Sequence, residues 1–395
     1  MKVAKKIDLD KLVTDPYVRE LIRQEKERQR AFPPASNLRS TEVFWRDHQV
    51  WLQEQGYMLR SRYHADWVPS ILSRDKDDIR KPLDAYSPRR PHILDARKIA
   101  TGQFVMLKKI LKTKHRHEVD IHEYLTTGDL ASHPHNHCAP LYDVLESPYD
   151  ENVVILVLPL YRMFDDPPFQ TVGEVVDFCR QIFEGLRFIH QNHVAHRDCG
   201  YMNIMMDATD LYPDGFHPVC DIKDAAWSDT LAKHYTRTQT PVKYYFIDFG
   251  ISCRFDPDDP EPRAFPRGAG DKTAPELSGM PMCPIDPFPT DVYYIGNVIR
   301  TNILTVYQGL DFVTPLVNDM VSVDPKKRPT MDEVVERFER IRYALPWWKL
   351  RARLWSSMED GHPWMTFTLN CHIPTNLEIV DATIPRTLNL SFTDL

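Results

Sequence analysis

The chain has 395 residues, of which 42% are hydrophobic and 27% charged, and its formal net charge is −7. This length suffices for a two-lobed enzyme of about 250 residues with extensions. The negative net charge provides no basic field for nucleic acid or an anionic membrane, so neither partner is expected. The seven cysteines contain no CxxC pair, which argues against a disulfide framework or a zinc ribbon.

The first residues, Met-Lys-Val-Ala-Lys-Lys, lead into a polar stretch without the apolar core of a signal peptide. No later apolar run is long enough to span a bilayer. We therefore expect an intracellular protein, cytoplasmic or nuclear, that does not associate with membranes.

Residues 1–91 divide into a charged part and an aromatic part. Alternating acids and bases from Val18 to Arg30 predict a solvated helix, which Pro33-Pro34 ends. We expect the aromatic-rich part from Ser40 to Arg90 to be an accessory segment packed onto a folded body. A partner-binding groove is the less favoured alternative. Its aromatic residues include Phe44, Trp45, Trp51, Tyr57, Tyr63 and Trp67.

The central part of the chain changes from strand patterns to helix patterns. Residues 92–112 predict a hairpin that turns at Thr101-Gly102, and residues 153–158 predict a buried strand. Helices are expected over 118–130, over the apolar positions Val175, Cys179, Ile182, Leu186 and Ile189, and over most of 291–342. Strands first and helices second predict an α+β fold with two lobes.

Three short motifs carry the chemistry, and they occur in a fixed order. His196-Arg197-Asp198 is followed by Asn203, then by Asp248-Phe249-Gly250, and finally by Ala274-Pro275-Glu276. Asp198 could accept a hydroxyl proton, the Asn203 amide oxygen could bind a metal, and the Asp248 carboxylate could bind Mg²⁺. Each motif alone is weak, but together and in this order they indicate phosphoryl transfer.

With these motifs the chain resembles the eukaryotic protein kinase superfamily, and its flanks resemble a divergent kinase-like family of basidiomycete fungi. The resemblance covers residues 92–345 and implies a small β-rich N-lobe over about 92–160 and a helical C-lobe over about 161–345. The Asp-, Pro- and Gly-containing stretch 207–243 is then an insertion, expected as a surface excursion between two strands. Residues 346–395 form a C-terminal extension.

The resemblance implies an enzyme that binds ATP and Mg²⁺ between two lobes and transfers the γ-phosphate to a protein hydroxyl, of Ser/Thr rather than Tyr type. Asp198 is the catalytic base, and Asn203 and Asp248 are the metal ligands. The alternative is a pseudokinase, a nucleotide-binding or scaffold module without turnover.

The resemblance also assigns residues that bind the nucleotide. Lys108, in Val-Met-Leu-Lys, holds the α- and β-phosphates and pairs with Glu118. Pro159 and Tyr161 face adenine at the hinge, and Met205 also belongs to the nucleotide-binding set.

Two further pairs belong to the scaffold that the resemblance implies. Asp291 braces the backbone of the His196-Arg197-Asp198 motif. Arg328, in Asp324-Pro-Lys-Lys-Arg-Pro-Thr330, pairs with Glu276. A buried pair of this kind is costly to break by removing one partner.

The chain departs from the family pattern around the phosphates. No glycine-rich loop precedes Lys108, so backbone amides cannot close over the phosphates in the usual manner. Arg89 and Arg90 could replace them with side-chain charge, although solvated arginines in a proline-rich turn are the more ordinary interpretation. Gly200 stands where the Ser/Thr enzymes have a lysine that stabilises the transferred phosphoryl group.

Two further departures concern the sites of adenine and of the acceptor. Met106 replaces the small residue above adenine, and Ala269 replaces the threonine that docks the acceptor.

Two clusters have alternative interpretations. Acidic residues of the segment 248–276 could pair with Arg197 in place of a phosphate, or could simply form a solvated loop. The tract His133-Pro-His-Asn-His137-Cys138 resembles a metal site but lacks a second ligand pair with zinc spacing.

Overall fold

The computed structural model describes residues 38–70, 82–228, 230–278 and 283–355. The predicted charged helix and its Pro33-Pro34 end lie outside the described residues, as does the chain after residue 355. The helices and strands are α3 (Val43–Asp47), α4 (Gln49–Glu54), β1 (Tyr57–Met58), β2 (Ile93–Lys98), β3 (Phe104–Leu111), α5 (Glu118–Thr126), α6 (Gly128–Ala131), β4 (Asp143–Glu146), β5 (Val153–Pro159), β6 (Arg162–Met163), α7 (Val172–Gln191), β7 (Val194–Ala195), β8 (Ile204–Asp207), β9 (Lys243–Phe246), β10 (Cys253–Arg254), α8 (Phe288–Ile299), α9 (Thr314–Met320), α10 (Met331–Ala344) and α11 (Trp347–Leu350). A π-helical turn, Arg300–Leu304, continues α8.

The first half of the described chain forms an antiparallel five-stranded sheet in the order β1-β2-β3-β5-β4. The predicted hairpin is confirmed as β2 and β3, with Ile93 opposite Lys108. Gly102 has φ +72° in the turn between the two strands, a conformation that glycine adopts without a Cβ clash. The predicted strand at 153–158 is confirmed as β5, whose central residues are buried.

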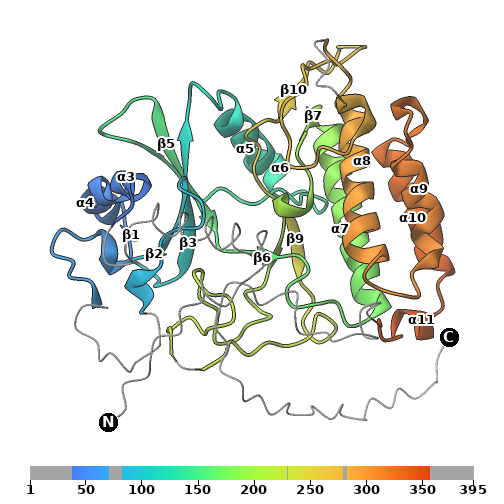
Figure 1. Ribbon diagram of the computed structural model, residues 1–395. Coiled ribbons are helices and arrows are strands. Elements are labelled where there is room, and N and C mark those ends of the chain that lie inside the picture. Colours follow the sequence, from blue (N-terminus) through green and yellow to red (C-terminus); the bar gives the residue numbers. More distant parts are fainter. Residues whose placement is uncertain (1–37, 71–81, 229, 279–282, 356–395) are drawn as a thin grey trace, which may run out of the picture. The chain divides into compact units, whose positions relative to one another are not determined.

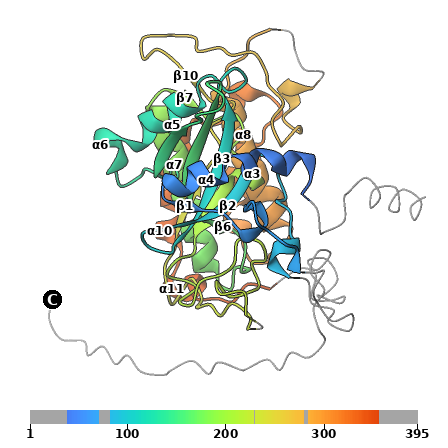
Figure 2. The ribbon, with the colours of Figure 1, turned by 90° about the vertical axis from the view of Figure 1, so that its left-hand side faces the viewer.

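The aromatic segment covers one face of this sheet. Figures 1 and 2 show α3 and α4 against the strands, and Trp45 and Tyr63 are fully buried in a core shared with β2, β3 and β5. Arg62 pairs with Glu42 inside this layer, and both side chains are inaccessible to solvent. The segment also supplies β1, which pairs with β2. The core packing expected for the aromatic residues is confirmed, and the connection from β1 to β2 runs over residues 59–92.

The prediction of one continuous helix over 118–130 is wrong. The structure has α5 and then the short helix α6, separated at Thr127. Thr127 is extended, with φ −121° and ψ 171°, and Gly128 follows with φ +57°. These backbone angles cannot continue a right-handed helix, so the apolar spacing extended the prediction across a real break.

The second half of the described chain is mainly helical, as predicted. The amphipathic helix is confirmed as α7, where the Thr171 side chain accepts a hydrogen bond from Glu174 N and caps the first turn. α7 packs against α10, which begins with a capping box formed by Thr330 and Glu333. The two-lobed α+β arrangement predicted from the sequence is confirmed (Figure 1). Among the described residues, no helix combines the length and apolar character needed to cross a membrane.

The connection between β8 and β9, residues 208–242, is more than the expected surface excursion. Several of its residues are buried, because two arginines hold its backbone and aromatic rings against the helical lobe. Arg162 donates to Asp221 O at 2.7 Å, with its guanidinium over the Tyr212 ring. Arg237 donates to Phe164 O at 2.8 Å. The buried residues in the described part of the connection are Ala208, Leu211, Tyr212, Phe216, His217, Cys220 and Arg237.

The same connection also reaches the sheet of the other lobe (Figure 1, yellow-green). The Arg97 guanidinium at the end of β2 donates to Ala225 O at 2.9 Å. The buried His217 ring lies edge-on to Phe104 of β3, with 5.2 Å between the ring centroids. Trp227 contacts both His217 and Tyr86, at 4.7 and 5.4 Å. Residues 208–242 therefore link the two lobes directly.

Replacing Trp227 with alanine tests this link. Each aromatic contact contributes about 0.5–1.5 kcal/mol beyond area burial, so Trp227→Ala should lower the free energy of unfolding by about 1–3 kcal/mol. Urea denaturation measures the change. Tyr235→Ala removes an exposed ring from the same connection and should change stability by less than about 0.5 kcal/mol. Equal losses in the two variants would show that the Trp227 contacts contribute nothing specific.

Candidate functional site

The loop that carries His196, Arg197 and Asp198 lies between β7 and β8 and is held by one buried carboxylate. Asp291, in the first turn of α8, accepts hydrogen bonds from His196 N at 2.8 Å and Arg197 N at 2.7 Å. Its side chain is fully buried. The main-chain donors compensate this buried charge, and together they impose the backbone of the loop, where Arg197 has φ +68°.

The Asp198 carboxylate has a defined orientation. One oxygen accepts a hydrogen bond from Gly270 N at 2.7 Å, and the other accepts one from Asn203 Nδ2 at 2.9 Å. Burial raises the pKa of Asp198, an effect that the Gly270 hydrogen bond partly opposes. A carboxylate in this state is a better proton acceptor than a solvated one, as a general base requires.

Lys108, Glu118 and Asp248 form a second charged cluster that joins three elements. Lys108 Nζ on β3 is hydrogen-bonded to the Glu118 carboxylate of α5 and to Asp248 Oδ1 at 2.8 Å. Burial acts to lower the pKa of Lys108, but the two carboxylates outweigh it and raise the pKa, so the ammonium stays charged. Burial acts to raise the pKa of Asp248, but Lys108 and Gly250 N hold it at about 2.

These residues have the donor set that magnesium and a nucleotide require. Within the described residues, both hydrogen bonds of the Asn203 side chain use Nδ2, which leaves its amide oxygen for a metal. Asp248 supplies an ionised carboxylate. No cluster of three or more His, Cys, Asp or Glu in the described chain could hold a metal alone. Mg²⁺ is commonly bound by one or two protein groups together with substrate phosphates, so the pair fits that ion.

The residues expected around adenine lie on β3, at the end of β5, in the hinge and on β8. Met106 of β3 is half-buried, two residues before Lys108 on the same face of the strand. Asp95 of β2 stands opposite Met106 and pairs with Arg60 at 3.2 Å, with only 7% of each side chain exposed. Sequence reasoning missed this ion pair, because Arg60 lies far from Asp95 along the chain.

The hinge follows β5, which ends at Pro159. The Tyr161 ring stacks on Tyr245 of β9, with 4.8 Å between the centroids and 10° between the planes. Met205 of β8 pairs with Tyr245 and is half-buried. The predicted residues Pro159, Tyr161 and Met205 therefore belong to the hinge and to the adjacent three-stranded sheet β6-β8-β9.

Arg197 makes contacts that differ from the expectation of a carboxylate partner. Its guanidinium donates to Ile251 O at 3.0 Å, to Cys253 Sγ at 2.9 Å and to Phe265 O. Within the described residues it forms no ion pair with the acidic residues of 256–261. Main-chain carbonyls therefore take the place that the sequence suggested for a carboxylate, since they reach the buried guanidinium where the exposed acids do not.

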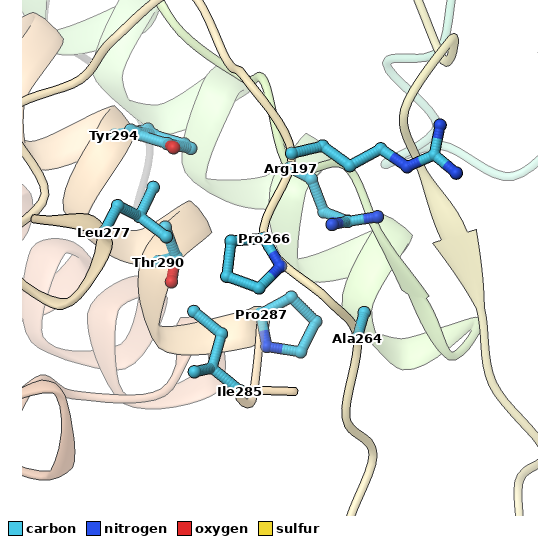
Figure 3. Close-up of a pocket in the computed structure, with 9 residues that line it drawn as sticks. Arg197, Ala264, Pro266, Leu277, Ile285, Pro287, Thr290 and Tyr294 are labelled. Carbon is cyan, nitrogen blue, oxygen red and sulfur yellow. The ribbon is translucent and has the colours of Figure 1, made fainter. Parts of the chain in front are cut away.

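A small cavity lies beside Arg197, between the chain segment that follows Asp248 and the start of α8 (Figure 3). Its volume is about 20 Å³, room for about one water molecule. Pro266, Pro287 and Tyr294 are among the residues that line it. The segment therefore packs closely against the helical lobe around Arg197.

The comparison with known proteins agrees with this geometry. Residues 91–303, slightly more than half of the chain, match the protein kinase domain. The chain belongs to the protein kinase family. NUAK family SNF1-like kinase 2 from Rattus norvegicus is 28% identical over 117 residues, and NUAK family SNF1-like kinase 1 from Mus musculus is 30% identical over 112 residues. Light-sensor Protein kinase from Ceratodon purpureus is 23% identical over 274 residues.

These matches are partial. They cover 28%, 27% and 57% of this chain, and 18%, 17% and 18% of the three relatives in the same order. The chain therefore spans less than a fifth of the length of the relatives that it matches.

The structure brings the predicted polar residues of the kinase domain into two adjacent groups. Lys108, Glu118 and Asp248 form one, and Asp198 and Asn203 form the other. Gly270 was missed, because a main-chain N–H donor has no side-chain signature in the sequence. The available signal was its position directly after Ala269, which stands where the family has the threonine that docks the acceptor. The Gly270 amide makes a contact to Asp198 that does not require a hydroxyl.

Gly200 leaves open space beside the loop that carries Asp198. Its backbone is extended, with φ −88° and ψ −175°, which any residue can adopt. A Cβ atom placed there would meet nothing within 4 Å. The backbone therefore does not require glycine at this position.

The expected scaffold pair is present and has two-point geometry. Arg328 Nη1 and Nη2 donate to the two oxygens of Glu276, both at 2.7 Å, and the Arg328 side chain is fully buried. Burial acts to raise the pKa of Glu276, but Arg328 and Thr290 lower it below its ordinary value.

The histidines of the tract 133–138 make structural contacts. His137 Nδ1 donates to Tyr244 O at 2.7 Å, and His133 stacks on Phe188.

Removing one partner of this pair should be more costly than removing both. Arg328→Met leaves Glu276 without its cation, so the free energy of unfolding should fall by about 3–5 kcal/mol. The double variant Glu276→Gln/Arg328→Met should recover part of that loss, as measured by chemical denaturation.

The pair should also show a characteristic pH dependence. Because the folded-state pKa of Glu276 is lowered, its stabilisation is complete above the unfolded-state value of about 4.3 and is lost as the pH falls below it. The stability difference between the wild type and Glu276→Gln should therefore shrink in acid. A difference that stays constant from pH 7 to pH 3 would contradict the assigned interaction.

Proposed function

We propose that the chain is a protein kinase that uses Mg-ATP to phosphorylate a hydroxyl group of a protein. The observation that carries this proposal is the simultaneous presence of the Lys108–Glu118–Asp248 cluster and an oriented Asp198. Phosphoryl transfer depends mainly on positioning and charge neutralisation. Both requirements have candidate residues in this arrangement.

Each residue has a distinct proposed role. Asp198 orients the acceptor hydroxyl and takes its proton. Asn203 and Asp248 hold Mg²⁺, and Lys108, positioned by Glu118, neutralises the α- and β-phosphates. Mg-ATP supplies the phosphoryl group that is transferred. Pro159, Tyr161 and Met205 border adenine in this proposal.

The contacts of Arg197 support activity without an activating phosphate. In many kinases such an arginine binds a phosphorylated residue, which orders the segment between Asp248 and Glu276. Here the guanidinium is already bound to the carbonyls of Ile251 and Phe265 in that segment. The loop around Asp198 thus has its supporting contacts in the unmodified chain.

A second candidate is a nucleotide-binding or scaffold module without turnover. The Arg60–Asp95 ion pair beside Met106 favours it, because these polar side chains border the cleft where adenine needs apolar contacts. The absence of a side chain at position 200 also favours it, since a cation there would stabilise the transferred group. Activity measurements separate the two candidates.

The catalytic assignment predicts the effect of Asp198→Asn. With labelled ATP and Mg²⁺, the wild type should label itself or a generic protein acceptor, and the variant should lose that labelling by at least about 100-fold, because the proton acceptor is absent. Asp129→Asn changes an exposed aspartate of α6 and should leave the rate unchanged. Equal incorporation in the wild type and Asp198→Asn would reject the enzymatic proposal. Absence of transfer together with a nucleotide-induced rise in melting temperature would favour the scaffold module.

The open space at Gly200 predicts a gain of activity. Gly200→Lys introduces a cation near Asp198 at a position where an added Cβ meets nothing within 4 Å, so the transfer rate should rise by as much as about 10²-fold, the scale of one electrostatic contact in a transition state. Gly200→Met has similar length without charge and is the matched control. A similar rate change in both variants would show that charge at position 200 is not the limiting factor.

A further inference from the structure

The turn that precedes β2 lies next to the catalytic lysine. Residues 89–92 end the long connection from β1, and the next residue, Ile93, stands directly opposite Lys108. Lys109 N donates to His92 O at 2.8 Å. The register of the β2–β3 pair therefore fixes this turn at the same end of the strands as Lys108.

The backbone of this turn is anchored, whereas its arginine side chains are exposed. Ile93 N donates to Arg90 O at 3.1 Å, and Trp45 Nε1 donates to Pro91 O at 3.0 Å. Trp45 itself is fully buried in the layer that covers the sheet. The core of the lobe therefore fixes the main-chain positions of Arg89 and Arg90.

The arginines of this lobe differ in their ion pairs and hydrogen bonds. Arg60 and Arg62 form buried ion pairs, and Arg97 donates to carbonyl oxygens. Within the described residues, by contrast, the side chains of Arg89 and Arg90 form no ion pair or hydrogen bond. Two cations without an ion pair or hydrogen bond to the described residues therefore lie on the turn that precedes β2.

Electrostatic interactions connect the turn to the Lys108–Asp248 pair. Partial burial lowers the pKa of His92, and Lys108 lowers it further, while Asp248 opposes them and Arg90 adds to the lowering. The strand register gives the geometry of this interaction, because it places His92 opposite Lys109, next to Lys108. The positive charge of the turn therefore adds to that of Lys108.

The sequence of the connection explains why these cations matter. No glycine occurs between Gly56 and Gly102, so the connection cannot form the glycine-rich loop whose amides cover the phosphates. A guanidinium offers five N–H donors in a planar fork that matches phosphate oxygens. Two such groups on an anchored turn can supply donors that the backbone does not.

We propose that Arg89 and Arg90 form a clamp that binds the phosphate chain of the nucleotide in place of a glycine-rich loop. This inference rests on the proposed function, because it places the phosphates at the Lys108–Asp248 cluster. The clamp makes affinity depend on the phosphates of the ligand more than on its base.

Nucleotide binding tests the clamp without measuring turnover. Calorimetry on the full chain with ATP, ADP and adenosine, each with Mg²⁺, should show that Arg89→Ala/Arg90→Ala weakens ATP binding on the order of 10- to 100-fold, the range for hydrogen bonds to charged groups. Adenosine affinity should not change. Arg89→Lys/Arg90→Lys keeps the charge and should restore part of the affinity. Arg46→Ala, an exposed arginine of α3 that pairs with Asp47, is the matched control.

Each outcome decides between the clamp and the proposed function. Equal ATP affinity in the wild type and the double alanine variant overturns the clamp and leaves the kinase proposal intact. Equal loss of ATP and adenosine binding also overturns the clamp, because the defect is then not specific to phosphates. Arginine-dependent ATP binding without phosphoryl transfer supports the clamp and overturns the kinase proposal. A wild type that binds neither ATP nor ADP overturns both.

Discussion

The buried carboxylate of Asp291 is the constraint on which the candidate site depends. It has no solvent contact and no lysine or arginine partner in the described chain, so hydrogen-bond donors must stabilise its charge. The main-chain N–H groups of His196 and Arg197 supply them, and His190 Nε2 lies 3.1 Å away. The N-terminus of α8 adds a favourable dipole. The energetic demand of one buried charge thus fixes the backbone that presents Asp198.

Among the contacts that connect the two lobes, three differ in physical kind. Lys108 from the sheet-containing lobe, which is also paired with Glu118, binds Asp248, which follows β9 in the other lobe. His115 Nδ1 donates to Gly250 O at 3.0 Å next to this cluster. The connection 208–242 makes the third link through His217 and Ala225. The third link combines aromatic contacts with the hydrogen bond from Arg97, and the strength of its aromatic part should depend little on salt.

Local patterns in the sequence were sufficient for much of the fold. The β2–β3 hairpin, the helix α7 and the order of the three motifs follow from spacing between near neighbours. Contacts between distant residues were not predictable in the same way. Arg60 meets Asp95, and Gly270 meets Asp198, only because the chain has folded. Nothing in the local pattern indicates such partners.

Arg197 shows the same limit for a residue whose importance was clear. The sequence correctly pointed to the segment after Asp248 as the source of its partners. Of the two alternatives left open there, a carboxylate partner and a solvated acidic loop, the structure has the second, because a buried guanidinium needs correctly placed acceptors. Main-chain carbonyls provide these without a sequence signature.

The departures from the kinase pattern differ in physical kind. At Gly200 the backbone is relaxed and the adjoining space is open, so the missing cation is a chemical deficit that the fold does not impose. The missing glycines are a structural change, because the connection from β1 to β2 joins a buried layer through the ion pair of Arg62 with Glu42. That layer could not move over a ligand without exposing unpaired charges, which is costly. In the proposed clamp, the phosphate contacts therefore come from side chains that reach outward from a fixed backbone.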